Sequence, residues 1–136
     1  MSESKTELRV LLVEDSKLVA DQIQELLQSV ACNVAVTVVA TESEALRAAV
    51  DLSPDIVILD LQLKQGTGFG VLKGLTSIEP EPTIAVLTNH ALPKYRDLAL
   101  MIGADYFLDK AHDFEALAGI IELIGRAREP SPTRMH

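Results

Sequence analysis

The sequence predicts an α/β fold, a doubly wound five-stranded parallel sheet with helices on both faces. Short apolar runs alternate with stretches of helical period along the chain. The runs are rich in β-branched residues and nearly continuous, as expected of strands buried on both faces of a parallel sheet. With 136 residues, 48% of them hydrophobic, the chain is long enough for one sizeable core and too short for two ordinary domains.

Each predicted strand is an apolar run, and each is followed by a predicted helix. The strands are Leu8–Val13, Val34–Val39, Asp55–Leu59, Thr83–Leu87 and Tyr106–Leu108. The helices follow from apolar residues three and four apart over residues 19–30, 45–49, 69–72, 92–102 and 114–124. Thr41 and Glu44 have the spacing of a capping box, which marks the start of the second helix.

We expect one domain over residues 8–125, a flexible polar N-terminus at residues 1–7 and a flexible C-terminal tail at residues 126–136. The tail contains Pro130 and Pro132 and has no apolar period. His112 is interpreted as a residue at the start of the last helix, and His90 as a solvent-facing loop residue.

Composition excludes several classes of function. Twelve Lys and Arg against 20 Asp and Glu give a formal net charge of -8, which argues against binding to nucleic acid or to anionic membranes. The single cysteine, Cys32, excludes an intramolecular disulfide. No apolar run approaches the roughly 18 residues of a membrane span. We therefore expect a cytoplasmic protein.

Polar residues follow the strands, where ligands bind in open parallel sheets. They are Glu14 and Asp15 after the first strand, Asp60 after the third, Thr88 after the fourth and Lys110 after the fifth. Each alone is more often a cap or turn residue. Three carboxylates close together repel one another, so they need a hard divalent cation such as Mg²⁺ to neutralise their charge. A carboxylate can also act as a nucleophile toward phosphorus. An ammonium and a hydroxyl would stabilise the phosphoryl oxygens.

Four segments, in this order and spacing, carry a family resemblance. They are LLVEDS (residues 11–16), PDIVILDLQL (54–63) with GTGF (66–69), VLTN (86–89) and GADYFLDK (103–110). Over residues 8–125 the chain resembles the receiver domains of bacterial two-component response regulators. The resemblance implies the flavodoxin-like strand order 2-1-3-4-5.

The resemblance also implies roles for individual residues. Asp60 matches the aspartate that accepts the phosphoryl group. Glu14, Asp15, Asp60 and the backbone carbonyl of Gln62 match the groups that hold Mg²⁺, with Mn²⁺ as a substitute.

Three further residues match the switch of the family. Thr88 and Lys110 match the hydroxyl and the ammonium that bond the phosphoryl group, and Thr88 with Phe107 matches the pair that moves on activation. The sequence departs from many receivers at Ala111, where proline is common, and at Asn89, where a very small residue is common. These departures leave phosphorylation expected and its kinetics open.

The function expected is that of a single-domain response regulator, which accepts a phosphoryl group from a histidine kinase or histidine phosphotransfer protein. Output would pass through a downstream protein on the face of the fourth helix, fifth strand and fifth helix, with no small-molecule turnover, from a monomer or weak dimer. The main alternative is a binding module that does not depend on phosphorylation. A hydrolase would need Asp where Gln62 stands, and a flavin carrier would suffer repulsion between Glu14–Asp15 and the flavin phosphate.

Overall fold

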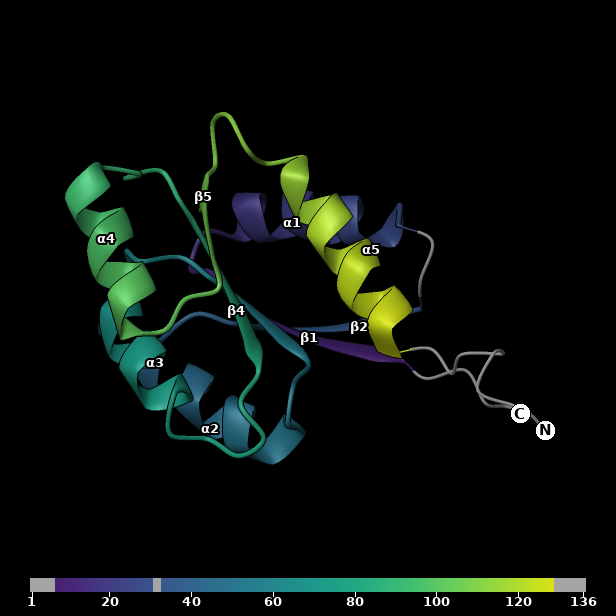
Figure 1. The fold of residues 1–136 in the computed structure, drawn as a ribbon, viewed down its shortest axis with the longest axis horizontal. Helices are drawn as coiled ribbons and strands as arrows, with labels where there is room; N and C mark the ends of the chain where they lie inside the picture. The colour runs from purple at the N-terminus through teal and green to yellow at the C-terminus, as the bar shows by residue number, and fades with distance from the viewer. Residues whose placement is uncertain (1–6, 31–32, 129–136) are drawn as a thin grey trace.

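Five parallel strands form one sheet in the order β2-β1-β3-β4-β5, as predicted (Figure 1). The structure, a computed structural model, describes residues 7–30 and 33–128. Its strands are β1 Leu8–Val13, β2 Val34–Val39, β3 Ile56–Leu59, β4 Thr83–Thr88 and β5 Tyr106–Asp109. Its helices are α1 Lys17–Gln28, α2 Glu42–Leu52, α3 Gly68–Leu75, α4 Pro93–Ile102 and α5 Ala116–Arg128.

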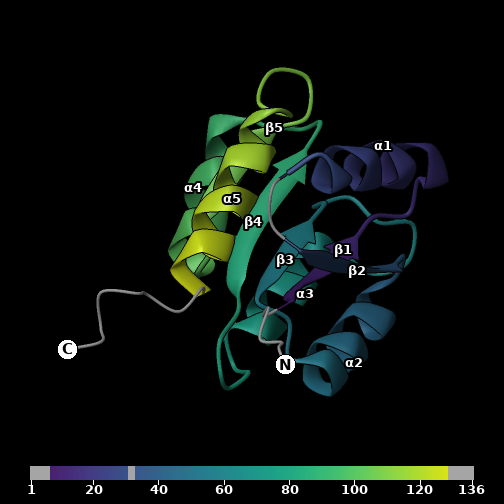
Figure 2. The same cartoon turned by 90° about the vertical axis from the view of Figure 1, so that its right-hand side faces the viewer.

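The helices cover both faces of the sheet because alternate residues of each strand point to opposite faces. In β1, Leu11 and Val13 pack in the cluster that includes α2, α3 and α4, whereas Val10 and Leu12 pack in the cluster that includes α1 and α5. Figure 1 shows these two groups of helices on either side of the strands. Figure 2 shows the twist of the sheet, with β1 and β2 toward one side and β4 and β5 toward the other.

Side-chain caps begin three of the helices. Ser16 accepts a hydrogen bond from the amide of Val19 at 3.3 Å and caps α1. Thr41 accepts from the amide of Glu44 at 3.2 Å, which confirms the predicted start of α2. Thr67 caps α3 in the same way. Each capping residue lies in the loop that follows a strand, so it marks where that loop ends and the next helix begins.

The last helix departs from the sequence prediction at both ends. The predicted tail is wrong for Arg126 to Arg128, because α5 continues to Arg128. Arginine and alanine are strong helix formers, and Pro130 comes only after this point. His112 lies in the turn before α5 rather than in the helix. Residues 1–6, Cys32 and residues 129–136 lie outside the described residues.

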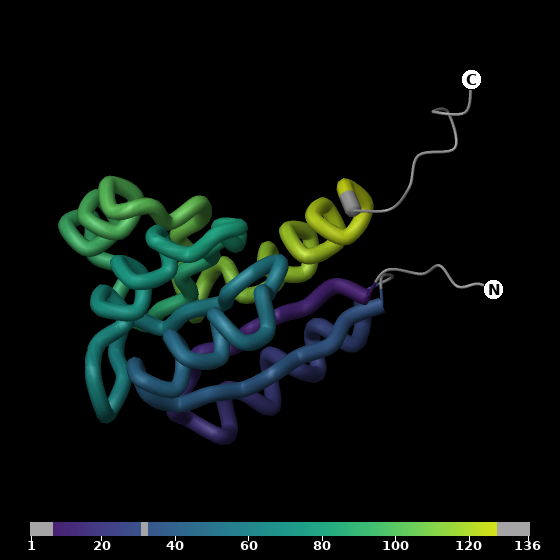
Figure 3. The backbone as a smooth tube through the Cα atoms, turned by 90° about the horizontal axis from the view of Figure 1, so that it is seen from below, coloured from purple at the N-terminus to yellow at the C-terminus, as the bar shows by residue number. Residues whose placement is uncertain are grey.

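The start of β1 and the end of α5 lie at the same end of the molecule (Figure 3). The carboxyl ends of the strands, where the predicted site residues lie, point the other way. Within residues 7–30 and 33–128, no helix is both long enough and apolar enough to cross a membrane.

Candidate functional site

The strand register brings the predicted polar residues to one rim of the sheet. Val13 at the end of β1 pairs with Leu59 at the end of β3. The next residues along the two strands are Glu14 and Asp60, so their side chains begin from neighbouring positions. Thr88 is the last residue of β4, the strand on the other side of β3.

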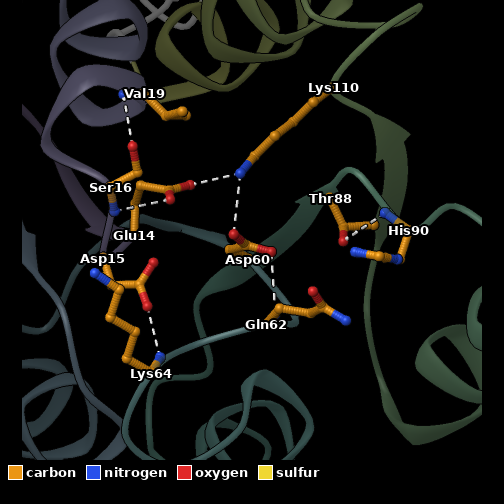
Figure 4. A network of polar contacts seen from close by, with 10 residues as sticks. All are labelled: Glu14, Asp15, Ser16, Val19, Asp60, Gln62, Lys64, Thr88, His90 and Lys110. Atoms are coloured by element: carbon orange, nitrogen blue, oxygen red, sulfur yellow. Dashed lines mark hydrogen bonds and ion pairs between the residues drawn. The ribbon is translucent and has the colours of Figure 1, made fainter.

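Lys110 links the two buried carboxylates. Its Nζ lies 2.8 Å from Oε1 of Glu14 and 3.0 Å from Oδ2 of Asp60 (Figure 4). The side chain of Lys110 is only 9% exposed, and Glu14 and Asp60 are 4% and 8% exposed. Charges taken out of water are tolerated where they are paired, so the ammonium neutralises part of the charge of both acids.

Backbone amides hold the remaining oxygens of the same two carboxylates. Oε2 of Glu14 accepts a hydrogen bond from the amide of Ser16 at 3.1 Å. Oδ1 of Asp60 accepts one from the amide of Gln62 at 3.1 Å. The Asp60 carboxylate is therefore oriented from both sides, by an ammonium and by an amide.

Burial and pairing shift the protonation equilibria of this cluster. Burial raises the pKa of Glu14, although the hydrogen bond and the charge of Lys110 act in the opposite direction. For Lys110, burial lowers the pKa, but the hydrogen bonds and charges of Glu14 and Asp60 more than offset it, so that its pKa lies above the ordinary lysine value. Lys110 thus carries a full positive charge at neutral pH.

Asp15 lies apart from the paired carboxylates. Its Oδ2 accepts a hydrogen bond from the backbone amide of Lys64 at 2.5 Å, in the loop that follows β3. Figure 4 shows Asp15 on the side of the cluster away from Lys110. Among the described residues, no three acidic, histidine or cysteine side chains are assembled as a ready-made metal cluster. Glu14 and Asp60 are brought together as predicted, and Asp15 lies beside them with its carboxylate turned to the loop.

The two predicted switch residues lie toward the same face of the sheet, because Thr88 is two positions after Val86 in β4 and Val86 pairs with Phe107 in β5. Thr88 is fully buried, and its Oγ1 accepts a hydrogen bond from the amide of His90 at 3.1 Å. Phe107 is half-buried and packs against the core on the side of α2, α3 and α4, whereas Tyr106 packs on the opposite face. His90 is exposed, as predicted.

The sequence model of the response regulator receiver domain matches residues 10–122. The chain belongs to the response regulator receiver domain family. The cell cycle response regulator CtrA of Brucella ovis is 32% identical over 122 residues, which are 89% of this chain and 52% of that protein. The chain therefore spans about half the length of the curated relatives it matches.

Solved receiver domains share the fold. The signal receiver domain of a putative Luxo repressor protein from Vibrio parahaemolyticus superposes with a TM-score of 0.80 at 24% identity, covering 90% of this chain and 92% of that one. The receiver domain of a sensor histidine kinase from Pseudomonas aeruginosa superposes with a TM-score of 0.77 at 26% identity, covering 89% and 99%. That structure has a magnesium ion coordinated in its active-site cleft.

A pocket of about 490 Å³ opens between the loops that follow β3 and β4. Gln62, Thr67, Phe69, His90 and Tyr95 are among the residues that line it. The rings of Phe69 and Tyr95 lie 6.1 Å apart, centroid to centroid.

Glu42, which no sequence pattern marked as a site residue, fixes the loop after β3. Its Oε1 accepts a hydrogen bond from the amide of Thr67 at 2.9 Å, and its own amide donates to the carbonyl of Gln65. A Cβ at Gly66, where φ is +84°, would lie 2.3 Å from the Cβ of Glu42. Twenty-five positions separate Glu42 from Thr67, so no local pattern could have signalled the contact.

Proposed function

We propose that Asp60 of this receiver accepts a phosphoryl group from a histidine kinase or a histidine phosphotransfer protein. In this step a carboxylate oxygen of Asp60 forms a bond to phosphorus while the phosphorus–nitrogen bond to the donor histidine breaks. The leaving imidazole takes up a proton. The observation that carries the proposal is the buried Asp60 carboxylate, oriented by Lys110 at 3.0 Å and by the amide of Gln62 at 3.1 Å.

The neighbouring residues suit the charge that develops on the phosphoryl oxygens. Lys110 supplies a fixed ammonium, which needs no reorganisation when the phosphoryl group arrives. Thr88 ends the adjacent strand and carries a hydroxyl that can turn from the amide of His90 toward the phosphoryl group. Bonding of Thr88 to that group would leave space for Phe107, the second residue of the switch.

The oxygen donors at the rim fit Mg²⁺, with Mn²⁺ as a substitute. Glu14, Asp15, Asp60 and the backbone carbonyl of Gln62 are the groups that would hold the ion, and all offer hard oxygen ligands. When bound, the ion would neutralise negative charge between the acceptor and the incoming group. The P. aeruginosa receiver with its coordinated magnesium supports this assignment.

For output we propose a protein partner on the face of α4, β5 and α5, which Figure 1 shows with β5 between the two helices. Leu98 and Met101 on α4 and Leu123 on α5 are exposed apolar residues on these elements. We propose a receiver, monomeric or weakly dimeric, that acts in the cytoplasm and turns over no small molecule. The net charge of -8 supports a protein partner rather than nucleic acid or an anionic membrane.

The test is transfer from a histidine-phosphorylated phosphotransfer protein carrying radiolabelled phosphate. With Mg²⁺, label should move to the wild-type receiver, stop moving when EDTA removes the ion, and not reach Asp60→Asn. A phosphoryl group on Asp60 should be lost after brief alkaline treatment with hydroxylamine. Equal labelling of Asp60→Asn would refute the assignment of the acceptor. A phosphorylation-independent module would be favoured if no donor transferred label and the partner bound equally well with and without a phosphoryl mimic on the receiver.

A further inference from the structure

The turn that carries Lys110 is organised around the side chain of Asp109. Oδ1 of Asp109 accepts a hydrogen bond from the amide of Ala111 at 2.9 Å. Its Oδ2 lies 3.0 Å from Nδ1 of His112. The carboxylate of Asp109 thus reaches over Lys110 to the two residues beyond it.

Asp113 closes the same turn from its far end. Its Oδ2 accepts a hydrogen bond from the amide of Asp109 at 3.0 Å, and its own amide donates to the carbonyl of Asp109 at 2.7 Å. The amide of His112 also donates to that carbonyl, at 3.2 Å. Residues 109–113 therefore form a closed hydrogen-bonded turn with an aspartate at each end, visible as the loop between β5 and α5 at the top of Figure 1.

This turn sets the backbone from which Lys110 reaches the site. The amide of Lys110 donates to the carbonyl of Thr88 at 3.0 Å, and its side chain extends to Glu14 and Asp60. A lysine side chain has several free torsions, so its ammonium is fixed in place only if its backbone is fixed. Ala111 cannot restrict the backbone as a proline would, and the Lys110–Ala111 bond is trans.

The charge state of Asp109 supports its part in the turn. The hydrogen bond from His112, followed by that from the amide of Ala111, lowers the pKa of Asp109. The carboxylate is therefore ionised at neutral pH, and an ionised carboxylate is a strong hydrogen-bond acceptor. On its other side, Thr88 pairs with Asp109 in the register of β4 and β5, which joins the turn to the strand that ends in the switch hydroxyl.

We propose that Asp109 is a positioning residue for Lys110, whose carboxylate fixes the 109–113 turn and so places the ammonium on Asp60. The effect on phosphoryl transfer rests on the proposed function. The position of the Lys110 ammonium does not rest on the proposed function, and a separate experiment measures it.

Competitive labelling of lysines measures the placement directly. Trace acetic anhydride in Mg²⁺-free buffer acetylates amines, and peptide mass spectrometry gives the ratio of Lys110 to Lys17. Lys17 is the internal reference because its side chain is 87% exposed, against 9% for Lys110. In Asp109→Ala the ratio should rise by about fivefold, the effect expected for loss of one hydrogen bond.

Two variants separate positioning from general damage to the fold. Asp109→Asn keeps an oxygen that accepts from the amide of Ala111, so its labelling ratio should stay within about twofold of the wild type. Asp97→Ala removes the same side chain from an exposed position on α4 and should leave the ratio unchanged. An unchanged ratio in folded Asp109→Ala, or an equal rise in Asp97→Ala, would overturn the proposal.

Phosphorylation then tests the consequence. Asp109→Ala should lower the rate of phosphoryl uptake at saturating donor by about fivefold, with Mg²⁺ affinity unchanged, because the metal-binding residues are not altered. In a Lys110→Ala background, Asp109→Ala should lower the rate no further, since the residue acts through Lys110. An equal loss in both backgrounds would refute positioning. A wild type that takes up no phosphate would refute the proposed function, while the labelling result would still decide the role of Asp109.

Discussion

Nζ of Lys110 lies 3.0 Å from Oδ2 of Asp60, although 50 residues separate the two along the chain. The contact crosses the end of β4, because β4 lies between β3 and β5 in the sheet. A strand-end lysine two strands away therefore neutralises part of the charge of Asp60. This arrangement makes the receiver's stability depend on the same charges as its proposed chemistry.

Replacing Lys110 by methionine should lower the free energy of unfolding. The change leaves Glu14 and Asp60 buried without their counter-charge, and breaking a buried pair in this way costs about 3–5 kcal/mol. Urea unfolding in Mg²⁺-free buffer measures the loss. Adding Glu14→Gln to Lys110→Met should recover part of it, because one uncompensated charge is removed.

The matched control is Lys17→Met, which breaks an exposed ion pair with Asp21. Exposed pairs of this kind contribute little, so the change in unfolding free energy should stay below about 1 kcal/mol. Similar losses for the two lysines would show that burial of the Lys110 pair carries no special weight.

Two glycines in α3 should differ sharply when replaced by alanine. A Cβ at Gly68 would lie 2.3 Å from the carbonyl oxygen of Asp60, so Gly68→Ala must displace the backbone at Asp60. A Cβ at Gly74 would lie 2.5 Å from a methyl group of Leu46, which can rotate away. We expect a loss of about 2–3 kcal/mol in unfolding free energy for Gly68→Ala.

For Gly74→Ala, the helix propensity gained, about 1 kcal/mol, offsets the adjustment of Leu46. Thermal and urea unfolding of the two variants provide the comparison. If Gly74→Ala proved the more damaging, the close approach of α3 to Asp60 would not be the constraint at this helix.

The titration of His112 should report its contact with Asp109. The hydrogen bond to Asp109, followed by the attraction of its charge, raises the pKa of His112. In the unfolded chain that pKa is ordinary. The contact therefore stabilises the fold fully at pH below the ordinary histidine pKa, and the contribution is lost as pH rises through the raised value.

NMR titration of the His112 ring measures this directly. Its pKa should fall toward the ordinary value in Asp109→Asn and stay unchanged in Asp97→Asn. No change in Asp109→Asn would show that the ring does not bond to Asp109 in solution.

Thr88→Val should separate phosphoryl uptake from switching. Valine keeps the volume of the fully buried side chain but removes the hydroxyl. Beryllofluoride should still bind at Asp60, but the ring signals of Phe107 should no longer respond in NMR spectra. Thr83→Val, at the other end of β4, serves as the control and should keep the response. A normal Phe107 response in Thr88→Val would remove the hydroxyl from the switch.

The sequence predicted the strands, their order and the residues at their carboxyl ends, because these depend on local apolar runs and on recognisable segments such as those ending in Asp60 and Lys110. It did not predict that Asp15 would turn to the amide of Lys64. That contact, like the one between Glu42 and Thr67, depends on loops that meet only after the sheet has formed. The hydrogen bonds of Asp109 are local, but the residues between it and Asp113 are not typical turn formers, so the sequence did not mark this turn.

The end of α5 is a second feature that the sequence could not predict. Prolines at 130 and 132 marked a break, but the sequence pattern could not place the end of the helix within a few residues, and the helix runs to Arg128. Helix ends depend on small differences in propensity, whereas the positions at the ends of buried strands are fixed by the packing of the whole sheet.

Intact mass after incubation with acetyl phosphate tests the central claim most directly. With Mg²⁺, the wild type should gain the mass of one phosphoryl group, and neither Asp60→Asn nor the wild type in EDTA should gain it. A gain of equal size in Asp60→Asn would contradict Asp60 as the acceptor. A wild type that gains no mass and also fails to bind beryllofluoride would contradict the account of this rim as a phosphoryl site.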